Sequence, residues 1–369
     1  MDSITTVSPG RINLIGEHTD YNDGFVLPAA IDKSTKVFLQ KNASPTHCKL
    51  VASNLSESFE FDLEKMNPIE GGWQNYVMGV VNELQKMGAK MAGFDAKFEG
   101  DVPIGAGMSS SASLECSFAF ALNELFRLGF DKLALIKAAQ MAEHNFVGIK
   151  CGIMDQFASV MGRKNHAMLL DCRDLTYQYF PLELGDYQLL LLNSNVAHSL
   201  ASSEYNIRRA QCEEGVALIK KRYEGVTNLR DINLEQLSGF FNQIPLTIFK
   251  RCYHVVSENQ RVLEATTALQ QQDFLLLGEL LYQSHFSLQN DYEVSCKEID
   301  FLVQLTLDKK YVLGSRIMGG GFGGCTISLI EKDKTNDFIQ LASEAYWRRF
   351  KTNLSSYTVL IEDGARVVT

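Results

Sequence analysis

A glycine- and serine-rich turn that leads directly into a helix is the feature of this sequence that most limits its fold. It occupies residues 101–126, DVPIGAGMSSSASLECSFAFALNELF. Gly105 and Gly107 lack a Cβ, so the backbone can turn tightly there and approach a ligand closely. Apolar residues at 114, 118, 121, 122 and 125 recur at three- and four-residue spacing, which predicts a helix after the turn.

Three consecutive serines stand where this helix should begin. A helix N-terminus presents unpaired N–H groups and the positive end of its dipole, which favour phosphate. An ordinary N-cap is the structural alternative, but it needs only one serine. The segment lacks both the Gly-Lys pair of a Walker loop and the third glycine of a dinucleotide fingerprint. We therefore predict a phosphate-binding loop formed by Gly105, Gly107, Ser109, Ser110 and Ser111.

Composition limits the partners of the chain. With 369 residues, 46% of them hydrophobic, it can form two domains with a sizeable core. A net charge of −9 disfavours nucleic acid and anionic membranes as partners. The eight cysteines form no Cys-x-x-Cys pair, and the N-terminus has no signal-peptide pattern. We expect a cytoplasmic protein with free thiols, whose oligomeric state stays open, with a monomer as one alternative.

The order of the expected elements indicates two lobes. We assign residues 1–180 to an N-terminal lobe that carries the phosphate-binding loop, and 181–369 to a C-terminal lobe, with the site in the cleft between them. Besides the helix after the phosphate-binding loop, the expected helices cover 73–88, 131–147, 152–162, 201–222, 233–242, 257–286, 295–307 and 335–351. The expected strands cover 4–15, 25–40, a hairpin within 49–63, 94–102, 167–175, 176–183, 187–193, 311–330 and 355–362.

Four segments resemble those of a known enzyme family. PIGAGMSSSAS is similar to the second motif of the GHMP small-molecule kinases. Residues 8–31, SPGRINLIGEHTDYNDGFVLPAAI, resemble the galactokinase signature almost residue for residue. GSRIMGGGFGGCTISLI at 314–330 is similar to the third motif of the galactokinase family, and GIKCGIMDQFASVMG at 148–162 to its catalytic-aspartate segment. The collinear resemblance implies an α+β, two-lobed GHMP-kinase-like fold with the active site in the cleft between the lobes.

Asp155 and Arg11 are the candidate catalytic residues. Phosphoryl transfer needs an oriented nucleophile and neutralised charge. Asp155 lies in the first turn of an expected helix, where a carboxylate is also common for structural reasons. The resemblance makes it the residue that faces the sugar hydroxyl, either as a base or as an electrostatic orienter. Arg11 is always charged and can contact phosphate in a bidentate manner; the resemblance places it between the sugar oxygen and the γ-phosphate.

A polar cluster follows the first expected strand. Glu17, His18 and Asp20 suit the recognition of sugar hydroxyls, since several positioned groups can discriminate epimers. With one histidine among them, we rank a metal site below a sugar site. The resemblance assigns sugar contacts to Glu17, His18, Asp20, Gly152 and Tyr205.

The resemblance also implies ATP and Mg²⁺. It makes Ser111 and Glu143 the metal ligands, with Ser110 as an alternative to Ser111. Magnesium takes few protein oxygens and keeps waters and phosphates as its other ligands, so a donor set of two residues is sufficient. Trp73 and Tyr76 match positions near the adenine, although packing of an amphipathic helix explains them equally well.

We therefore expect an ATP-dependent kinase that phosphorylates α-D-galactose at the anomeric hydroxyl, the first committed step of galactose catabolism. Two alternatives remain open on the sequence. One is a kinase for N-acetylgalactosamine or another related sugar, since no motif gives the size of the pocket around the second carbon. The other is a catalytically silent sensor that binds galactose and ATP; the intact serine loop, Arg11 and Asp155 disfavour it.

Overall fold

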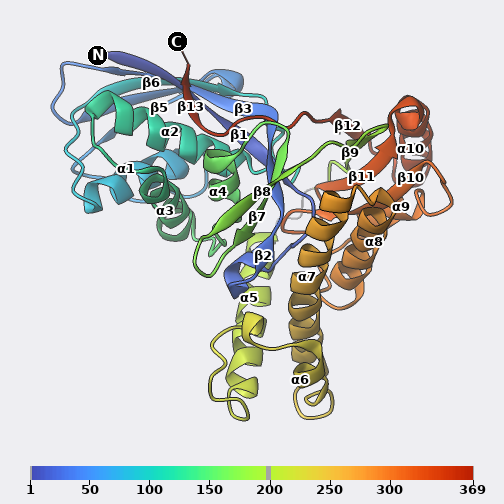
Figure 1. Cartoon of the computed structure of the whole chain (residues 1–369). Helices are drawn as coiled ribbons and strands as arrows, with labels where there is room; N and C mark the ends of the chain where they lie inside the picture. Colours follow the sequence, from blue (N-terminus) through green and yellow to red (C-terminus); the bar gives the residue numbers. More distant parts are fainter. Residues whose placement is uncertain (1, 197–200, 369) are drawn as a thin grey trace.

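The computed structural model describes residues 2–196 and 201–368 and has helices and sheets in both halves of the chain (Figure 1). A six-stranded sheet in the order β13-β1-β3-β6-β4-β5 forms the N-terminal part. Its neighbours pair antiparallel, apart from the parallel pair β4 and β6. The strands are β1 (Ser3–Asn13), β3 (Pro28–Lys41), β4 (His47–Ala52), β5 (Glu57–Asp62), β6 (Phe94–Gly100) and β13 (Arg366–Val368).

Four helices accompany this sheet, and they carry much of the predicted site. α2 packs on β1 and β3, while α1 and α3 pack on α2 and α4 lies against β1. Buried apolar residues of these helices and of the sheet form one core, which includes Phe94, Phe118 and Phe157. The helices are α1 (Gln74–Lys86), α2 (Ser110–Phe126), α3 (Lys132–Ala142) and α4 (Met154–Met161).

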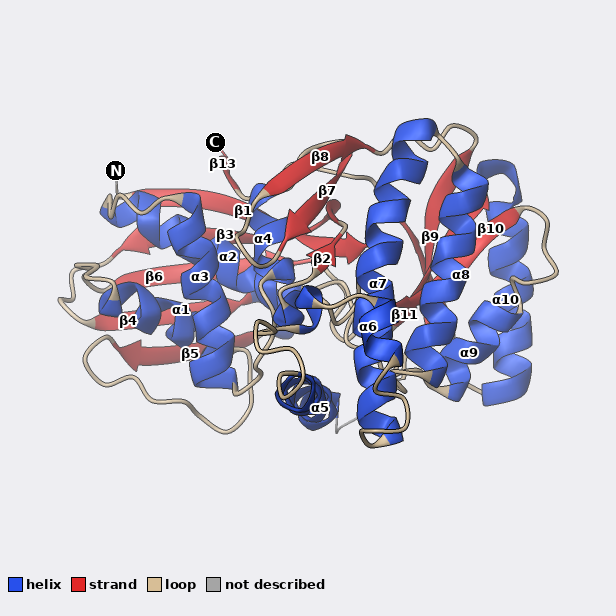
Figure 2. Ribbon diagram, turned by 60° about the horizontal axis from the view of Figure 1, so that its bottom comes forward, coloured by secondary structure: helices blue, strands red, loops and turns tan. Residues whose placement is uncertain are grey.

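The C-terminal part is built on an antiparallel four-stranded sheet in the order β10-β11-β9-β12. Figure 2 shows the long helices α7 and α8 side by side, and α8 packs on β10. The strands are β9 (Tyr187–Asn193), β10 (Val312–Met318), β11 (Cys325–Glu331) and β12 (Ser355–Thr358). The helices are α5 (Ala201–Ile219), α6 (Leu234–Ser238), α7 (Leu246–Gln271), α8 (Phe274–Asn290), α9 (Lys297–Gln304) and α10 (Thr335–Phe350).

A small three-stranded sheet and a shared core lie between these two parts. The sheet contains β2 (Phe25–Val26), β7 (His166–Asp171) and β8 (Tyr177–Pro181). The shared core combines Ile12, near the end of β1, and Leu14, just after it, with Val262 of α7 and Leu281 of α8. The end of the chain also returns to the first sheet, because β13 pairs with β1. The boundary between 180 and 181 stays a prediction.

Several predicted elements have different boundaries in the structure. The helix predicted at 257–286 is wrong as a single element: α7 begins at Leu246, and Gln272 adopts a left-handed φ of 55° that ends it. Asp273 then caps α8 by accepting from the backbone N of Leu276. The helix predicted at 233–242 is only α6, and β13 was not predicted. Within the described residues, no helix is long and apolar enough to cross a membrane.

Candidate active site

The catalytic candidates lie together although 144 residues separate them in the chain. Arg11, on β1 and only 4% exposed, donates from Nε to Oδ1 of Asp155 at 2.8 Å. A second guanidinium nitrogen donates to the carbonyl of Gly107 in the predicted phosphate-binding loop. Burial opposes the charged form of Arg11, but the carboxylates of Asp155, Glu17 and Asp20 together outweigh this effect, so the pKa of Arg11 is raised. The guanidinium group thus places a permanent positive charge between the predicted phosphate-binding loop and Asp155.

Ser109 also contacts Asp155. It stands at the N-cap of α2 with a left-handed φ of 57°, an uncommon conformation for a residue other than glycine. Its hydroxyl makes no capping bond and donates instead to Oδ2 of Asp155 at 2.6 Å. Both carboxylate oxygens are therefore held, which fixes the orientation of this side chain. The phosphate role that the sequence suggested for Ser109 stays a prediction.

Asp155 faces a cavity of about 170 Å³ that collects residues from both halves of the chain. The five predicted sugar-binding residues all line it, as do Arg11, Ser111 and Glu143. The first half supplies Glu17, His18, Asp20 and Gly152, and the second supplies Tyr205 together with Gly319 and Gly320. The structure thus brings together side chains that the sequence could only propose segment by segment.

The side chain of Asp20 leaves room only for a glycine at position 152. A Cβ built on Gly152 would lie 1.9 Å from Oδ2 of Asp20, so any larger residue would displace this carboxylate. Asp20 begins a short 3₁₀ turn, Asp20–Asn22, and accepts a hydrogen bond from the backbone N of Tyr21 at 3.0 Å. Burial and then the charge of Asp155 raise the pKa of Asp20 to about 7. The carboxyl group therefore titrates near neutral pH.

His18 lines this cavity and has one ring nitrogen without a hydrogen-bond partner among the described residues. Its Nδ1 lies 2.8 Å from the hydroxyl of Tyr21, and the rings of Tyr205 and Tyr292 pack at centroid distances of 5.4 and 4.7 Å. Burial, followed by His254 and Arg208, lowers the pKa of His18 to about 3, so its ring is neutral. Its Nε2 is buried without a partner among the described residues. A bound hydroxyl group would remove the cost of that unsatisfied atom.

Glu143 fits the magnesium of a nucleotide complex. It is 6% exposed, begins a π-helical turn (Glu143–Val147) and lines the cavity beside Ser111. Burial raises the pKa of Glu143, an unfavourable situation that a cation would relieve. Across the described residues no group of three or more His, Cys, Asp or Glu could form a metal cage. One carboxylate and one hydroxyl suit Mg²⁺ that arrives with phosphates.

A second cavity, of about 340 Å³, lies on the other side of the serine loop. Trp73, Tyr76, Ser110 and Ser111 line it, together with apolar residues of β6 and α2. Trp73 packs edge-on against Phe98, with 5.0 Å between the ring centroids. Its indole N–H donates to Oε2 of Glu57 at 2.7 Å. Ser111 borders both cavities, which puts the start of α2 between them. A nucleotide base in the larger cavity would place its phosphates toward Asp155.

The glycines of the loop have the conformations that their positions suggested. Gly105 and Gly107 both have φ of +73°, in the left-handed region. A Cβ on Gly107 would lie 2.9 Å from the carbonyl oxygen of Met318, so the loop packs directly against the glycine turn after β10. The sequence analysis did not identify Arg316 of this segment, a lone charge in an apolar strand that is fully buried.

Three family models match the chain. They are the GHMP kinases N terminal domain at residues 75–163, the galactokinase galactose-binding signature at 2–41, and the GHMP kinases C terminal model at 265–348. The galactokinase of Thermotoga maritima is 44% identical over 98% of this chain and 99% of its own length. That of Thermosipho africanus is 41% identical over 97% of each chain.

Solved structures agree with these sequence relatives. The Lactococcus lactis galactokinase complexed with galactose aligns with a TM-score of 0.95 and 36% identity, over 99% of this chain and 95% of that one. A mevalonate kinase aligns with a TM-score of 0.66 at 17% identity, which shows the shared fold alone. The predicted GHMP-kinase-like fold is confirmed. The chain is thus a sugar kinase that uses ATP, and it belongs to the galactokinase family of the GHMP kinases.

Proposed function

We propose that this chain transfers the γ-phosphoryl group of ATP to the anomeric hydroxyl of α-D-galactose, giving galactose 1-phosphate and ADP. The observation that carries the proposal is the Arg11–Asp155 pair, 2.8 Å apart, in the wall of the cavity that the predicted sugar-binding residues share. A relative of 36% identity is described in complex with galactose. The cavity supplies an anion, a cation and several groups that can bind hydroxyls within one space.

Asp155 has the role of orienting the attacking hydroxyl. Arg11 and Ser109 each hold one of its oxygens, and each oxygen retains a lone pair for the sugar. The anomeric oxygen forms a bond to the γ-phosphorus while the bond between that phosphorus and the bridging oxygen of ADP breaks. The hydroxyl proton passes to Asp155 and then to solvent. Orientation and proton acceptance are thus combined in one carboxylate.

Arg11 stabilises the charge that develops during this transfer. Phosphoryl transfer spreads negative charge over the equatorial oxygens, and enzymes neutralise it with fixed cations. Arg11 is held by Asp155 and by the carbonyl of Gly107, so its charge is positioned before the substrates bind. Glu143 and Ser111 would hold Mg²⁺ on the ATP phosphates, where the ion supplies further charge neutralisation.

A coupled ADP-release assay over a panel of sugars tests the proposal. We expect turnover with D-galactose, and none with D-glucose, its epimer at the fourth carbon. N-acetylgalactosamine belongs in the panel, because a larger group at the second carbon has to fit a cavity of about 170 Å³. Turnover of N-acetylgalactosamine in preference to galactose would replace the proposed substrate. Binding of galactose and ATP without ADP release would show a sensor instead of a kinase.

The Asp20→Asn variant separates sugar recognition from stability. Because the pKa of Asp20 is about 7 in the fold, the group is neutral below that pH and ionised above it. An ionised carboxylate accepts hydroxyl hydrogen bonds more strongly. We expect the KM of the wild-type enzyme for galactose to fall as the pH rises through 7. The variant should lose this dependence and raise the KM by about tenfold at pH 8, with the KM for ATP nearly unchanged.

The same variant should be more stable than the wild type at alkaline pH. The folded pKa of Asp20 is raised from 3.8, so the stability that its protonated form contributes is lost as the pH rises through 7. Asparagine carries no such charge. A thermal melt should therefore give a higher Tm for Asp20→Asn at pH 8 and no such gain at pH 4. Equal losses of galactose and ATP affinity would contradict the assignment of Asp20 to the sugar.

A further inference from the structure

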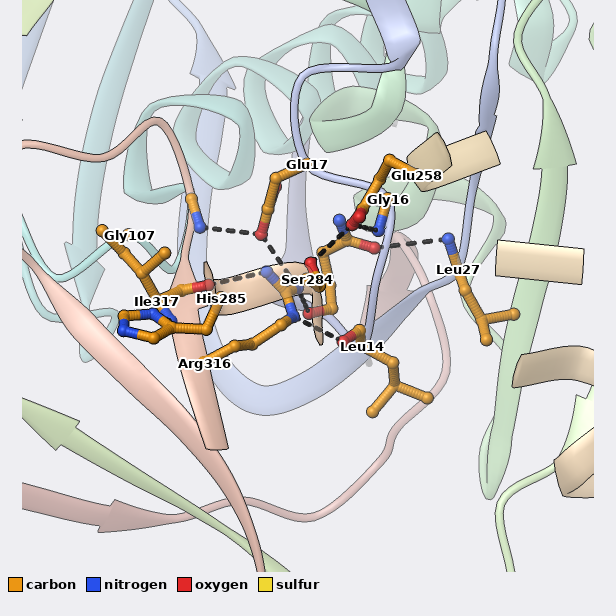
Figure 3. A network of polar contacts seen from close by, with 12 residues as sticks. Leu14, Gly16, Glu17, Leu27, Gly107, Glu258, Ser284, His285, Arg316 and Ile317 are labelled. Atoms are coloured by element: carbon orange, nitrogen blue, oxygen red, sulfur yellow. Dashed lines mark hydrogen bonds and ion pairs between the residues drawn. The ribbon is translucent and has the colours of Figure 1, made fainter. Parts of the chain in front are cut away.

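One oxygen of the predicted sugar ligand Glu17 is occupied before any sugar arrives. Its Oε1 accepts from the backbone N of Gly319 at 2.8 Å. The same oxygen accepts from Nη2 of Arg316 at 3.1 Å (Figure 3). Glu17 is only 2% exposed, although it lines the sugar cavity. Among the described residues, Oε2 has no such partner and is the oxygen left for a sugar hydroxyl. This carboxylate therefore joins the sugar cavity to the glycine turn after β10.

Arg316 holds Glu17 from inside the protein. It lies on β10, is fully buried, and uses all three guanidinium nitrogens on main-chain carbonyls as well as on Glu17. Nε donates to Leu14 at 2.7 Å, Nη1 to Ile317 at 2.6 Å, and Nη2 to Asn13. The bonded carbonyls of Asn13 and Leu14 belong to the segment that leads from β1 into the sugar-binding cluster. The guanidinium thus ties the first motif to the third.

The same glycine turn packs on the phosphate-binding loop. A Cβ on Gly319 would lie 3.1 Å from the Cα of Gly107, so the two backbones are in direct contact. The carbonyl of Gly107 in turn accepts from Arg11. Contacts therefore run without interruption from Arg316 through Glu17, Gly319 and Gly107 to Arg11. A shift of Glu17 would therefore displace groups at both the sugar cavity and the phosphate-binding loop.

We propose that Arg316 is a positioning residue for the reaction, which orients Glu17 toward the sugar and keeps the sugar cavity in register with the phosphate-binding loop. The inference rests on the proposed function, since it assumes that Glu17 contacts the sugar. A fully buried ion pair is weak evidence for stability, because hydrophobic residues often replace one at no loss. Arg316 does not line the sugar cavity, so we expect it to act through Glu17 and the backbone that it holds.

A double-mutant cycle with Arg316→Lys and Glu17→Ala tests this role. Lysine keeps the charge but cannot reproduce the fork of donors. We expect Arg316→Lys to raise the KM for galactose by about three- to tenfold, the scale of coupling between residues in contact. In the double variant the KM should be no higher than in Glu17→Ala alone, because no sugar ligand then remains at residue 17 for Arg316 to position.

Arg251→Lys is the matched control. Arg251 is 2% exposed and also bonds a main-chain carbonyl, that of Asp291, and a carboxylate, that of Glu293, yet none of these residues lines the cavity. The Arg251→Lys variant should have a lower Tm than the wild type and an unchanged KM for galactose. If Arg316→Lys behaves in the same way, or if its effect on KM multiplies with that of Glu17→Ala, the positioning role is wrong and Arg316 is merely structural.

A comparison of Glu17→Gln with Glu17→Ala gives a second test that leaves Arg316 intact and decides the matter if Arg316→Lys does not fold. Glutamine keeps an oxygen for Gly319 and Arg316, whereas alanine removes it. Alanine should therefore raise the KM for ATP above the glutamine value, and equal values would overturn the inference. Turnover of galactose by the wild-type protein tests the proposed function separately, and its absence would be seen before any variant is made.

Discussion

The Asp155→Asn variant should turn over about 10²–10⁴-fold more slowly than the wild-type enzyme, the usual range when a general acid–base group is lost. Asparagine has nearly the same size; its amide oxygen can still accept from Arg11, and its amide nitrogen can donate to the hydroxyl oxygen of Ser109, so the carboxamide should occupy the same place. It lacks the charge that orients the hydroxyl and the ability to take its proton. Single-turnover kinetics together with calorimetric binding of galactose and of ATP would separate the chemical step from binding.

We expect both substrates to bind this variant with nearly wild-type affinity. Asp337→Asn is a suitable control, because Asp337 also lies in the first turn of a helix, α10, but is exposed and lines neither cavity. It should leave kcat unchanged. A folded Asp155→Asn protein that binds both substrates and keeps its wild-type kcat would contradict the proposed mechanism.

Glu143→Gln should weaken the apparent affinity for Mg²⁺ by at least about 10- to 100-fold, the loss that follows when only the outer partners of metal ligands are changed. At limiting Mg²⁺ the activity should fall accordingly, and saturating Mg²⁺ should restore part of it. The physical reason is that an amide cannot supply the negative charge that a hard cation prefers. Titration of activity with Mg²⁺ at a fixed ATP concentration measures the shift.

The fold should tolerate this substitution. Burial raises the pKa of Glu143, so a neutral glutamine costs less to bury than the ionised carboxylate, and the Tm at pH 8 should not fall. Glu298→Gln provides the control, because its side chain is 12% exposed on α9 and lines neither cavity. An unchanged Mg²⁺ titration in Glu143→Gln would remove this residue from the metal site, whatever happens to its stability.

Local patterns were sufficient for most of the elements around the site. The apolar spacing after the serine loop predicted α2, and the strand expected at 187–193 is β9. Patterns failed where tertiary contacts decide. Periodicity continues across 257–286, so only the left-handed Gln272 and the cap at Asp273 divide this stretch into two helices. The short β13 has no pattern of its own and exists because β1 offers it a free edge.

The sequence alone identified the segments of the site, since glycine turns, a serine cluster and the polar residues after β1 are local features. It could not determine which side chains meet. The hydroxyl of Ser109, in the predicted phosphate-binding loop, donates to Asp155, 46 residues away, a contact that the sequence did not predict. Arg316 passed as one residue of a strand until the fold buried it against Glu17, 299 residues away. Such pairs depend on the packing of distant segments, whose partners no local pattern specifies; only the tertiary structure decided them.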